Sequence, residues 1–100
     1  MGVNNREYRL APKAREDMEA VWLYSRTQWG VAQAEQYIDD LTEAFTFLAD
    51  SPKSGRACDR IRQHYRQYPV VRHVVYYRMT AYGIEVMRIL HDRMLATRHL

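Results

Sequence analysis

The chain has 100 residues, of which 47% are hydrophobic and 12% aromatic, so it has enough apolar surface for one core and is too short for two. No apolar run approaches the roughly 20 residues that cross a bilayer, and an N-terminus without a charged n-region or an apolar h-region predicts a cytoplasmic protein without a membrane partner. The net charge of +3 hides an asymmetry, because residues 1–50 hold five basic and nine acidic side chains, whereas residues 51–100 hold ten basic and three acidic ones.

The first half predicts a short strand at 7–11 followed by two helices. Pro12 suits the first turn of a helix, and apolar residues then recur every three or four positions as far as Trp29. Gly30 fits the end of this helix, because a positive φ costs glycine little. A second periodic stretch covers 31–49, and the link is so short that the helices must fold back as an antiparallel hairpin.

The second half begins with an irregular, arginine-rich connection at 53–64 and continues as a sheet. Three strands joined by tight turns are expected at 65–70, 73–80 and 84–91. Asp92 is expected to cap a short helix at 93–100. The predicted fold class is therefore α+β, in the order β-α-α-β-β-β-(α), with an antiparallel sheet packed against an α-helical hairpin. Residues 1–100 are expected to form a single domain, of which 1–6 are expected to be flexible.

Strand parity predicts which side chains of the last strand face the helices. Arg88 and Leu90 share one face, and Ile89 and His91 share the other. The face of Arg88 is the one assigned to the helices, where an unpaired guanidinium would be costly. Asp17 lies on the inner side of the first predicted helix, so a structural pair between Asp17 and Arg88 is expected rather than contact of Arg88 with a target.

Few other residues carry an obvious chemistry. Cys58 is the only cysteine, which is typical of a reduced thiol rather than of a disulfide scaffold. The four histidines have no close ligand spacing, so we expect neither a metal site nor a cofactor. The basic second half indicates an anionic partner, either a nucleic acid or an acidic protein segment. Basic residues that only keep a small domain soluble would explain the same charge count.

Short sequence motifs, which occur in the same order in a known protein family, are spread over nearly the whole chain. They are Tyr8-Arg9-Leu10-Ala11-Pro12, Asp17-Met18, Trp29-Gly30, Gln33-Ala34, Leu48-Ala49, Ser51-Pro52, Gly55-Arg56, Tyr77-Arg78 and Arg88-Ile89-Leu90-His91. Together with the order of elements, they resemble the ParE-type toxins of the RelE/ParE superfamily. The resemblance implies the toxin half of a type II toxin–antitoxin pair, neutralised by a small cognate antitoxin that folds on binding, in a complex that can form higher-order oligomers. It implies DNA gyrase as the target, with no sequence-specific DNA binding by the toxin alone.

The candidate contacts follow from this resemblance. Leu23 and Phe47 lie off the main stripes of their helices, as expected of apolar groups that a folding partner covers, although isolated exposed apolar residues are also common. We expect the antitoxin to cross the hairpin as a helix and to continue along the sheet as an extended segment. The antitoxin-binding candidates are Leu23, Phe47, Trp22 and Tyr76. The candidates for contact with gyrase are His91, Arg93 and Met94.

Two alternatives stay open: a ribosome-dependent mRNA endonuclease of the RelE type, and a non-toxic remnant that only binds antitoxin. By resemblance, the ribonuclease relatives use the sheet face away from the hairpin. RNA cleavage needs a general base, a general acid and cations around the phosphate. The lysine or glutamate that relatives use as a base has no clear counterpart, and residues 95–100 contain no tyrosine, so we expect no catalytic residue. The candidates for an RNA cleft are His64, Arg66, His73, His91 and Arg93.

Overall fold

The computed structural model describes residues 6–100. The elements in chain order are β1 (Glu7–Leu10), α1 (Pro12–Trp29), α2 (Val31–Asp50), the 3₁₀ turn η1 (Pro52–Ser54), β2 (Arg56–Ala57), β3 (Arg66–Val70), β4 (His73–Thr80), β5 (Gly83–His91) and α3 (Ala96–His99). The α+β class and the order of the main elements are as predicted, with β2 as an addition. Residues 1–6 were expected to be flexible, and residues 1–5 lie outside the described part of the chain.

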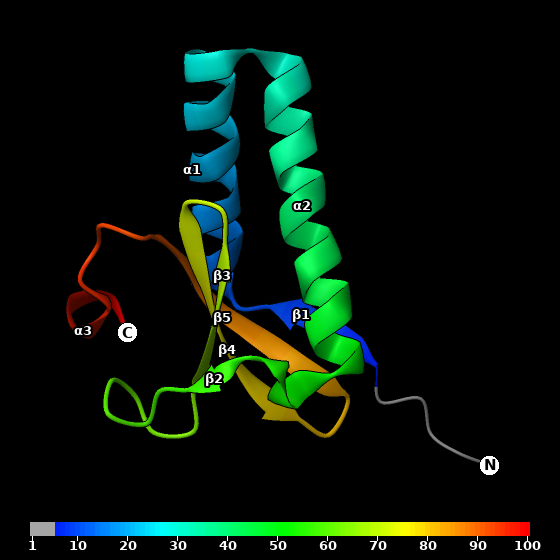
Figure 1. Ribbon diagram of the computed structural model, residues 1–100, viewed down its shortest axis with the longest axis vertical. Helices are drawn as coiled ribbons and strands as arrows, with labels where there is room; N and C mark the ends of the chain where they lie inside the picture. The colour runs from blue at the N-terminus through cyan, green and yellow to red at the C-terminus, as the bar shows by residue number, and fades with distance from the viewer. Residues whose placement is uncertain (1–5) are drawn as a thin grey trace.

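The strands form one five-stranded sheet in the order β1-β5-β4-β3-β2 (Figure 1). β3, β4 and β5 pair antiparallel, as predicted, but β1 pairs parallel to β5. The sheet is therefore mixed rather than wholly antiparallel. β1 and β2 lie at opposite edges, because the helical hairpin carries the chain across one face of the sheet between them.

The two-residue strand β2 lies in a segment that was predicted to be irregular. It pairs with β3, and the turn before it is fastened to the sheet by Tyr77. The Tyr77 hydroxyl accepts the N–H of Gly55 at 2.9 Å and donates to the carbonyl of Pro52 at 2.6 Å. These tertiary bonds fix a strand that is too short to show a periodic pattern in the sequence.

The hairpin covers one face of the sheet, and its far half projects beyond the ends of the strands (Figure 1). Gly30 links the helices with φ +94°, which fits the prediction for this position. Trp29 was predicted to continue the core stripe, yet it is 53% exposed, because no strand lies beneath the projecting end. The main buried side chains between the layers are Ala14, Val21, Ala34, Leu41, Phe45, Leu48, Val75, Tyr77, Ile84 and Val86.

A β-bulge in β5 changes which side chains face the helices. Tyr76 pairs with Arg88 but Tyr77 pairs with Val86, so Met87 has no partner in β4. An extra residue reverses the alternation that follows it. Ile89 accordingly packs in the core beneath the hairpin and Leu90 on the opposite face. Arg88 pairs with Tyr76 and so shares the side of the sheet away from the hairpin. The predicted facing of Arg88, Ile89, Leu90 and His91 is therefore wrong.

The sheet face away from the hairpin is partly covered by residues 58–65 and by the C-terminal segment. Cys58, Tyr76 and Leu90 form a second buried cluster there. The predicted helix at 93–100 with an Asp92 cap is wrong, because α3 spans only Ala96–His99 and has no side-chain cap. The N–H of Asp92 instead donates to the carbonyl of Arg72 at 2.9 Å, and the chain then turns at residues 92–93, where the N–H of Met94 donates to the carbonyl of His91 at 2.9 Å. Among residues 6–100, no helix combines the length and the hydropathy that crossing a bilayer requires.

Candidate functional site

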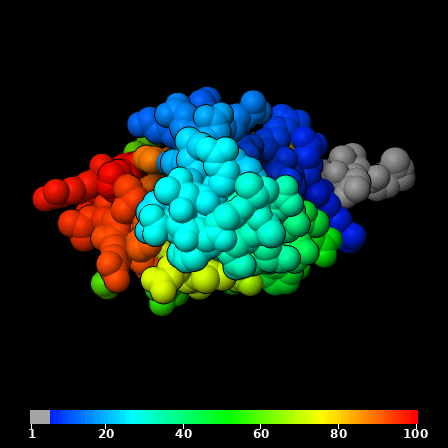
Figure 2. All heavy atoms as spheres, turned by 90° about the horizontal axis from the view of Figure 1, so that it is seen from above, coloured from blue at the N-terminus to red at the C-terminus, as the bar shows by residue number. Residues whose placement is uncertain are grey.

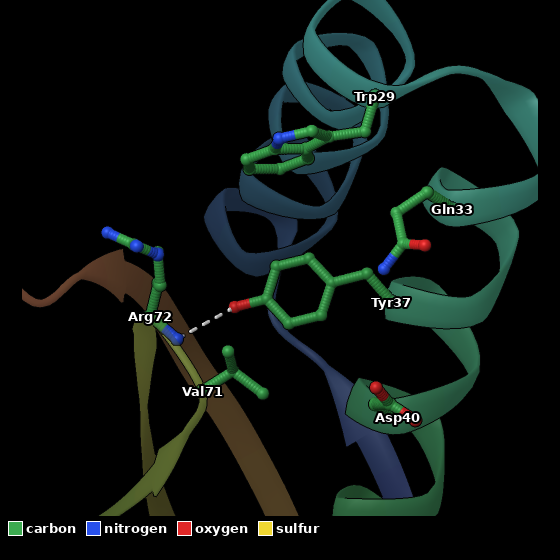
Figure 3. A pocket seen from close by; sticks show the side chains of 6 residues that line it. All are labelled: Trp29, Gln33, Tyr37, Asp40, Val71 and Arg72. Carbon is green, nitrogen blue, oxygen red and sulfur yellow. Dashed lines mark hydrogen bonds between the residues drawn. The ribbon is translucent and has the colours of Figure 1, made fainter.

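A cleft lies where the projecting end of the hairpin meets the β3–β4 turn and the start of the C-terminal segment. Seen from above in Figure 2, the turn (yellow) and the segment after β5 (orange) surface beside the hairpin tip (cyan). The larger part of the cleft has a volume of about 470 Å³, and its lining residues, drawn in Figure 3, are Trp29, Gln33, Tyr37, Asp40, Val71 and Arg72. An adjoining part of about 210 Å³ shares Trp29, Tyr37 and Arg72 and is also lined by Tyr24, Ser25, His73, His91 and Arg93. The two parts together are termed the tip cleft.

The hydroxyl of Tyr37 ties α2 to the β3–β4 turn. It lies 3.1 Å from the carbonyl oxygen of Val70, 3.2 Å from the backbone nitrogen of Arg72 and 2.6 Å from Nδ1 of His73 (Figure 3 draws the Arg72 bond). A hydroxyl has one proton and two lone pairs. All three bonds form together when it donates to Val70 and accepts the Arg72 N–H and a His73 Nδ1–H. Burial raises the pKa of Tyr37, so the hydroxyl keeps this proton.

His73 and His91 face each other across the ends of β4 and β5. They are register partners, and their ring centroids lie 5.3 Å apart. Burial, with the neighbouring His91, lowers the pKa of His73, so this imidazole is neutral at pH 7. Nδ1 of His91 lies 3.1 Å from the backbone nitrogen of Arg93 and 3.0 Å from Oδ1 of Asp92. A bare Nδ1 accepts the Arg93 N–H, whereas a protonated Nδ1 donates to Asp92, and the two bonds exclude each other.

The tip cleft contains two of the three residues proposed to contact gyrase. His91 and Arg93 line it, and Met94, which is 41% exposed, follows directly in the chain. Sequence reasoning missed Trp29 and Arg72. The position of Trp29 immediately before Gly30 could have indicated that its side chain is exposed, because the end of a helical hairpin has no neighbouring element on its outer side.

The residues proposed for an RNA cleft do not come together. His73 and Arg93 line the tip cleft, whereas His64 and Arg66 line a separate depression of about 390 Å³. Arg66 and His73 lie at opposite ends of the β3–β4 pair, since Arg66 pairs with Tyr77 and His73 pairs with Val70. Four residues of strand correspond to about 13 Å. The expectation that they converge on the face away from the hairpin is wrong, because His73 contacts α2 on the helix side.

The antitoxin-binding candidates occupy three different environments. Trp22 and Leu23 line an apolar groove of about 450 Å³ between the two helices, together with Met18, Glu19 and Ile38. Phe47 is exposed near the other end of α2 and packs against Tyr68, with ring centroids 5.8 Å apart. Tyr76 is only 6% exposed. Its assignment as an antitoxin contact is wrong, because residues 58–65 cover it.

Asp17 and Arg88 lie in contact, in the arrangement expected from the sequence. Nε and Nη2 of Arg88 donate to the two carboxylate oxygens of Asp17 at 2.8 and 3.0 Å. The N–H of Ile89 donates to the same carboxylate at 2.9 Å, and Nη1 of Arg88 donates to the carbonyl of His99 at 2.8 Å. The hydrogen bond with Asp17 raises the pKa of Arg88. This network joins α1, the bulge of β5 and the C-terminal segment that borders the tip cleft.

Comparison with known proteins supplies the family. Residues 8–96 match the family described as the ParE toxin of type II toxin–antitoxin system, parDE. The chain is 44% identical over 94 residues to Toxin ParE1 of Mycobacterium tuberculosis and 37% identical over 93 residues to Toxin ParE1 of Caulobacter vibrioides, in each case covering 93% of this chain and 96% of the relative. A solved structure described as the chromosomal ParDE TA system from P. aeruginosa shares the fold, with a TM-score of 0.75 and 17% identity over 89% of this chain and 98% of that chain. These matches confirm the resemblance drawn from the short motifs, and the chain belongs to the family of ParE toxins of type II toxin–antitoxin systems.

Proposed function

We propose that this toxin inhibits DNA gyrase by binding it through the tip cleft, without catalysing a reaction. The observation that carries the proposal is the set of exposed anchors around the cleft. Trp29 and Tyr24 are each more than half exposed, and their rings meet edge to face at 5.9 Å. Arg72 and Arg93 make no ion pair with any residue in 6–100. Aromatic and arginine side chains of this kind dominate the binding energy of protein interfaces.

The two histidines of the tip cleft are held in place by hydrogen bonds. Nδ1 of His73 is engaged by Tyr37, and Nδ1 of His91 is engaged by its own chain neighbours. A bond to Nδ1 leaves Nε2 of each ring able to exchange a proton, so these bonds orient the imidazoles in the cleft wall, where they serve either binding or proton transfer.

The antitoxin, by the same proposal, neutralises the toxin through the apolar groove of Trp22 and Leu23. Leu23 is 52% exposed, and the groove between two helices fits the apolar face of a third helix. The exposed pair of Phe47 and Tyr68, at the side of α2 towards β3, supports an extended segment that follows the helix of the antitoxin.

A supercoiling assay with purified gyrase tests the proposed target. Toxin freed of antitoxin is expected to block supercoiling, and the double substitution Trp29→Ala, Arg93→Ala is expected to restore it. Phe47→Ala is the matched control, because it removes an exposed aromatic side chain far from the tip cleft. Full supercoiling in the presence of the wild-type toxin, or equal inhibition by all three proteins, would contradict the proposal.

One observation favours the RelE-type ribonuclease as a second candidate. His73, His91 and Arg93 line one cleft, and two imidazoles beside a guanidinium are groups that phosphodiester cleavage employs. Addition of the toxin to a translating extract, followed by mapping of mRNA ends, distinguishes the two functions. Cleavage between codons that disappears with His91→Ala would favour the ribonuclease.

A further inference from the structure

We propose that a second surface of this toxin binds the phosphate backbone of nucleic acid without reading its sequence. The surface, termed the arginine face, is formed by residues 58–65 and the adjoining strands, at the end of the sheet away from the hairpin tip (Figure 1). Its basic residues are Arg56, Arg60, Arg62, Arg66 and Arg78. This inference goes beyond the proposed function, because the depression at its centre shares no lining residue with the tip cleft.

The arginine face carries positive charge that the protein neutralises only at Arg78, which pairs with Glu85. Residues 53–78 contain seven basic side chains and a single acidic one, Asp59. The Asp59 carboxylate already accepts the N–H of His64 at 2.8 Å. Within residues 6–100, Arg56, Arg60 and Arg62 form no ion pair. Uncompensated charge concentrated in this way raises the local concentration of an anionic ligand.

The backbone that carries these arginines is held in one conformation. The N–H of Cys58 donates to the carbonyl of Tyr65 at 2.9 Å, and the N–H groups of Ile61 and Arg62 return to the carbonyl of Cys58 at 2.9 and 3.1 Å. Cys58, Ile61 and Tyr65 pack onto the sheet face around Tyr76. A segment that is already ordered loses less entropy when it binds, so the loop is suited to present charge to a ligand.

The polarity of the exposed surface favours nucleic acid over a protein partner. No large hydrophobic side chain is exposed between residues 53 and 70, because the apolar residues of the loop are turned onto the sheet. Met79 of β4, which lines the central depression, is 45% exposed and is a single apolar group beside His64, Arg66 and Arg78. The core of a protein interface needs apolar or aromatic anchors, whereas interfaces with nucleic acid are polar and strongly positive. Guanidinium groups also bind phosphate oxygens in a bidentate manner. A protein partner finds its anchors in the apolar groove and in the tip cleft instead.

The test measures binding of the purified toxin to nucleic acid by fluorescence anisotropy over a series of salt concentrations. The probes are a duplex DNA and a single-stranded RNA of unrelated sequence, since both offer the same phosphate chemistry, and the probe that binds more tightly identifies the source. Affinity is expected to fall steeply between about 50 and 200 mM salt, and the double substitution Arg60→Gln, Arg62→Gln is expected to reduce the slope of log affinity against log salt by roughly 2.

The matched control is the double substitution Arg15→Gln, Arg26→Gln, which removes the same charge from exposed positions of α1 and is expected to leave the slope unchanged. Equal melting temperatures establish that both variants are folded. Absence of binding at low salt, or an equal loss of slope in the control, would overturn the proposal. Weaker binding of the cognate antitoxin by the Arg60, Arg62 variant, with binding to nucleic acid intact, would assign the arginine face to a protein partner instead.

Discussion

The carboxylate of Asp17 accepts hydrogen bonds from both the guanidinium of Arg88 and the N–H of Ile89, so a single side chain of α1 holds the two residues that follow the bulge of β5. β1 ends its pairing with β5 at Val86. Beyond that point Asp17, rather than a neighbouring strand, accepts the backbone N–H of Ile89. Both side chains of the ion pair are largely buried, with 16% and 14% exposed.

Removal of this guanidinium is expected to destabilise the fold. Arg88→Ala leaves the Asp17 carboxylate without its partner in a largely buried position, which costs about 2–4 kcal/mol. At roughly 4–8 °C per kcal/mol for a domain of this size, the melting temperature falls by about 8 °C or more. Arg78→Ala is the control, because its pair with Glu85 is more exposed and is worth at most about 1 kcal/mol. An unchanged melting temperature for Arg88→Ala would rule out the structural role of the pair.

Gly83 is expected to tolerate no side chain. It has φ +142°, and a Cβ there would collide with the backbone of Glu7 in the neighbouring strand. Gly83→Ala is therefore expected to lose more than about 2 kcal/mol in urea unfolding, from the combination of strain and clash. Gly30→Ala is the comparison, because its φ is also positive but nothing lies within 4 Å of the added Cβ. Similar losses in the two variants would show that the approach of β1 to Gly83 is unimportant.

Acid is expected to weaken the fold through His73. Its pKa is lowered from the ordinary value of 6.5, so the unfolded chain binds the proton more readily than the folded one. The contribution of His73 to the free energy of unfolding is therefore fully present above about pH 6.5, the pKa of this histidine in the unfolded chain. It is lost as the pH falls from there towards the lower pKa of His73 in the folded protein. His73→Asn keeps a donor for Tyr37 and removes the titration, so urea unfolding of this variant is expected to depend less on pH in this window. Equal pH dependence in the two proteins would contradict the assignment.

The apolar groove is expected to control neutralisation. Leu23→Glu places a charge where we propose that an antitoxin helix packs, and it is expected to weaken antitoxin binding at least tenfold, about 1.4 kcal/mol or more. The exposure of Leu23 implies that the fold itself is little affected. Isothermal titration with the cognate antitoxin measures the change, and Lys13→Glu serves as an exposed control on the same helix. Unchanged affinity of the Leu23 variant would place the antitoxin elsewhere.

The sequence predicted the elements well where periodicity decides them, and less well where tertiary contacts decide. The strand bounds of β4 and the helical hairpin follow from apolar spacing. The bulge at Met87 does not, because alternating residues look the same with or without it, and this one residue moved His91 to the helix side. The tip cleft was equally hidden, since the projection of the hairpin beyond the strands depends on how the two layers pack. The Asp17 and Arg88 pair was predicted correctly from a wrong premise, because the bulge places Arg88 on the side of Tyr76 and the guanidinium reaches Asp17 beyond the end of β1.

The stoichiometry of gyrase inhibition distinguishes a binding toxin from an enzyme. In a supercoiling assay at several gyrase concentrations, the amount of toxin that halves the activity is expected to rise in proportion to gyrase, and the messenger RNA of a translating extract is expected to stay intact at the same toxin concentrations. Gyrase that remains active at any toxin concentration, together with substoichiometric cleavage of ribosome-bound mRNA that His73→Ala or His91→Ala abolishes, would contradict the proposed mechanism.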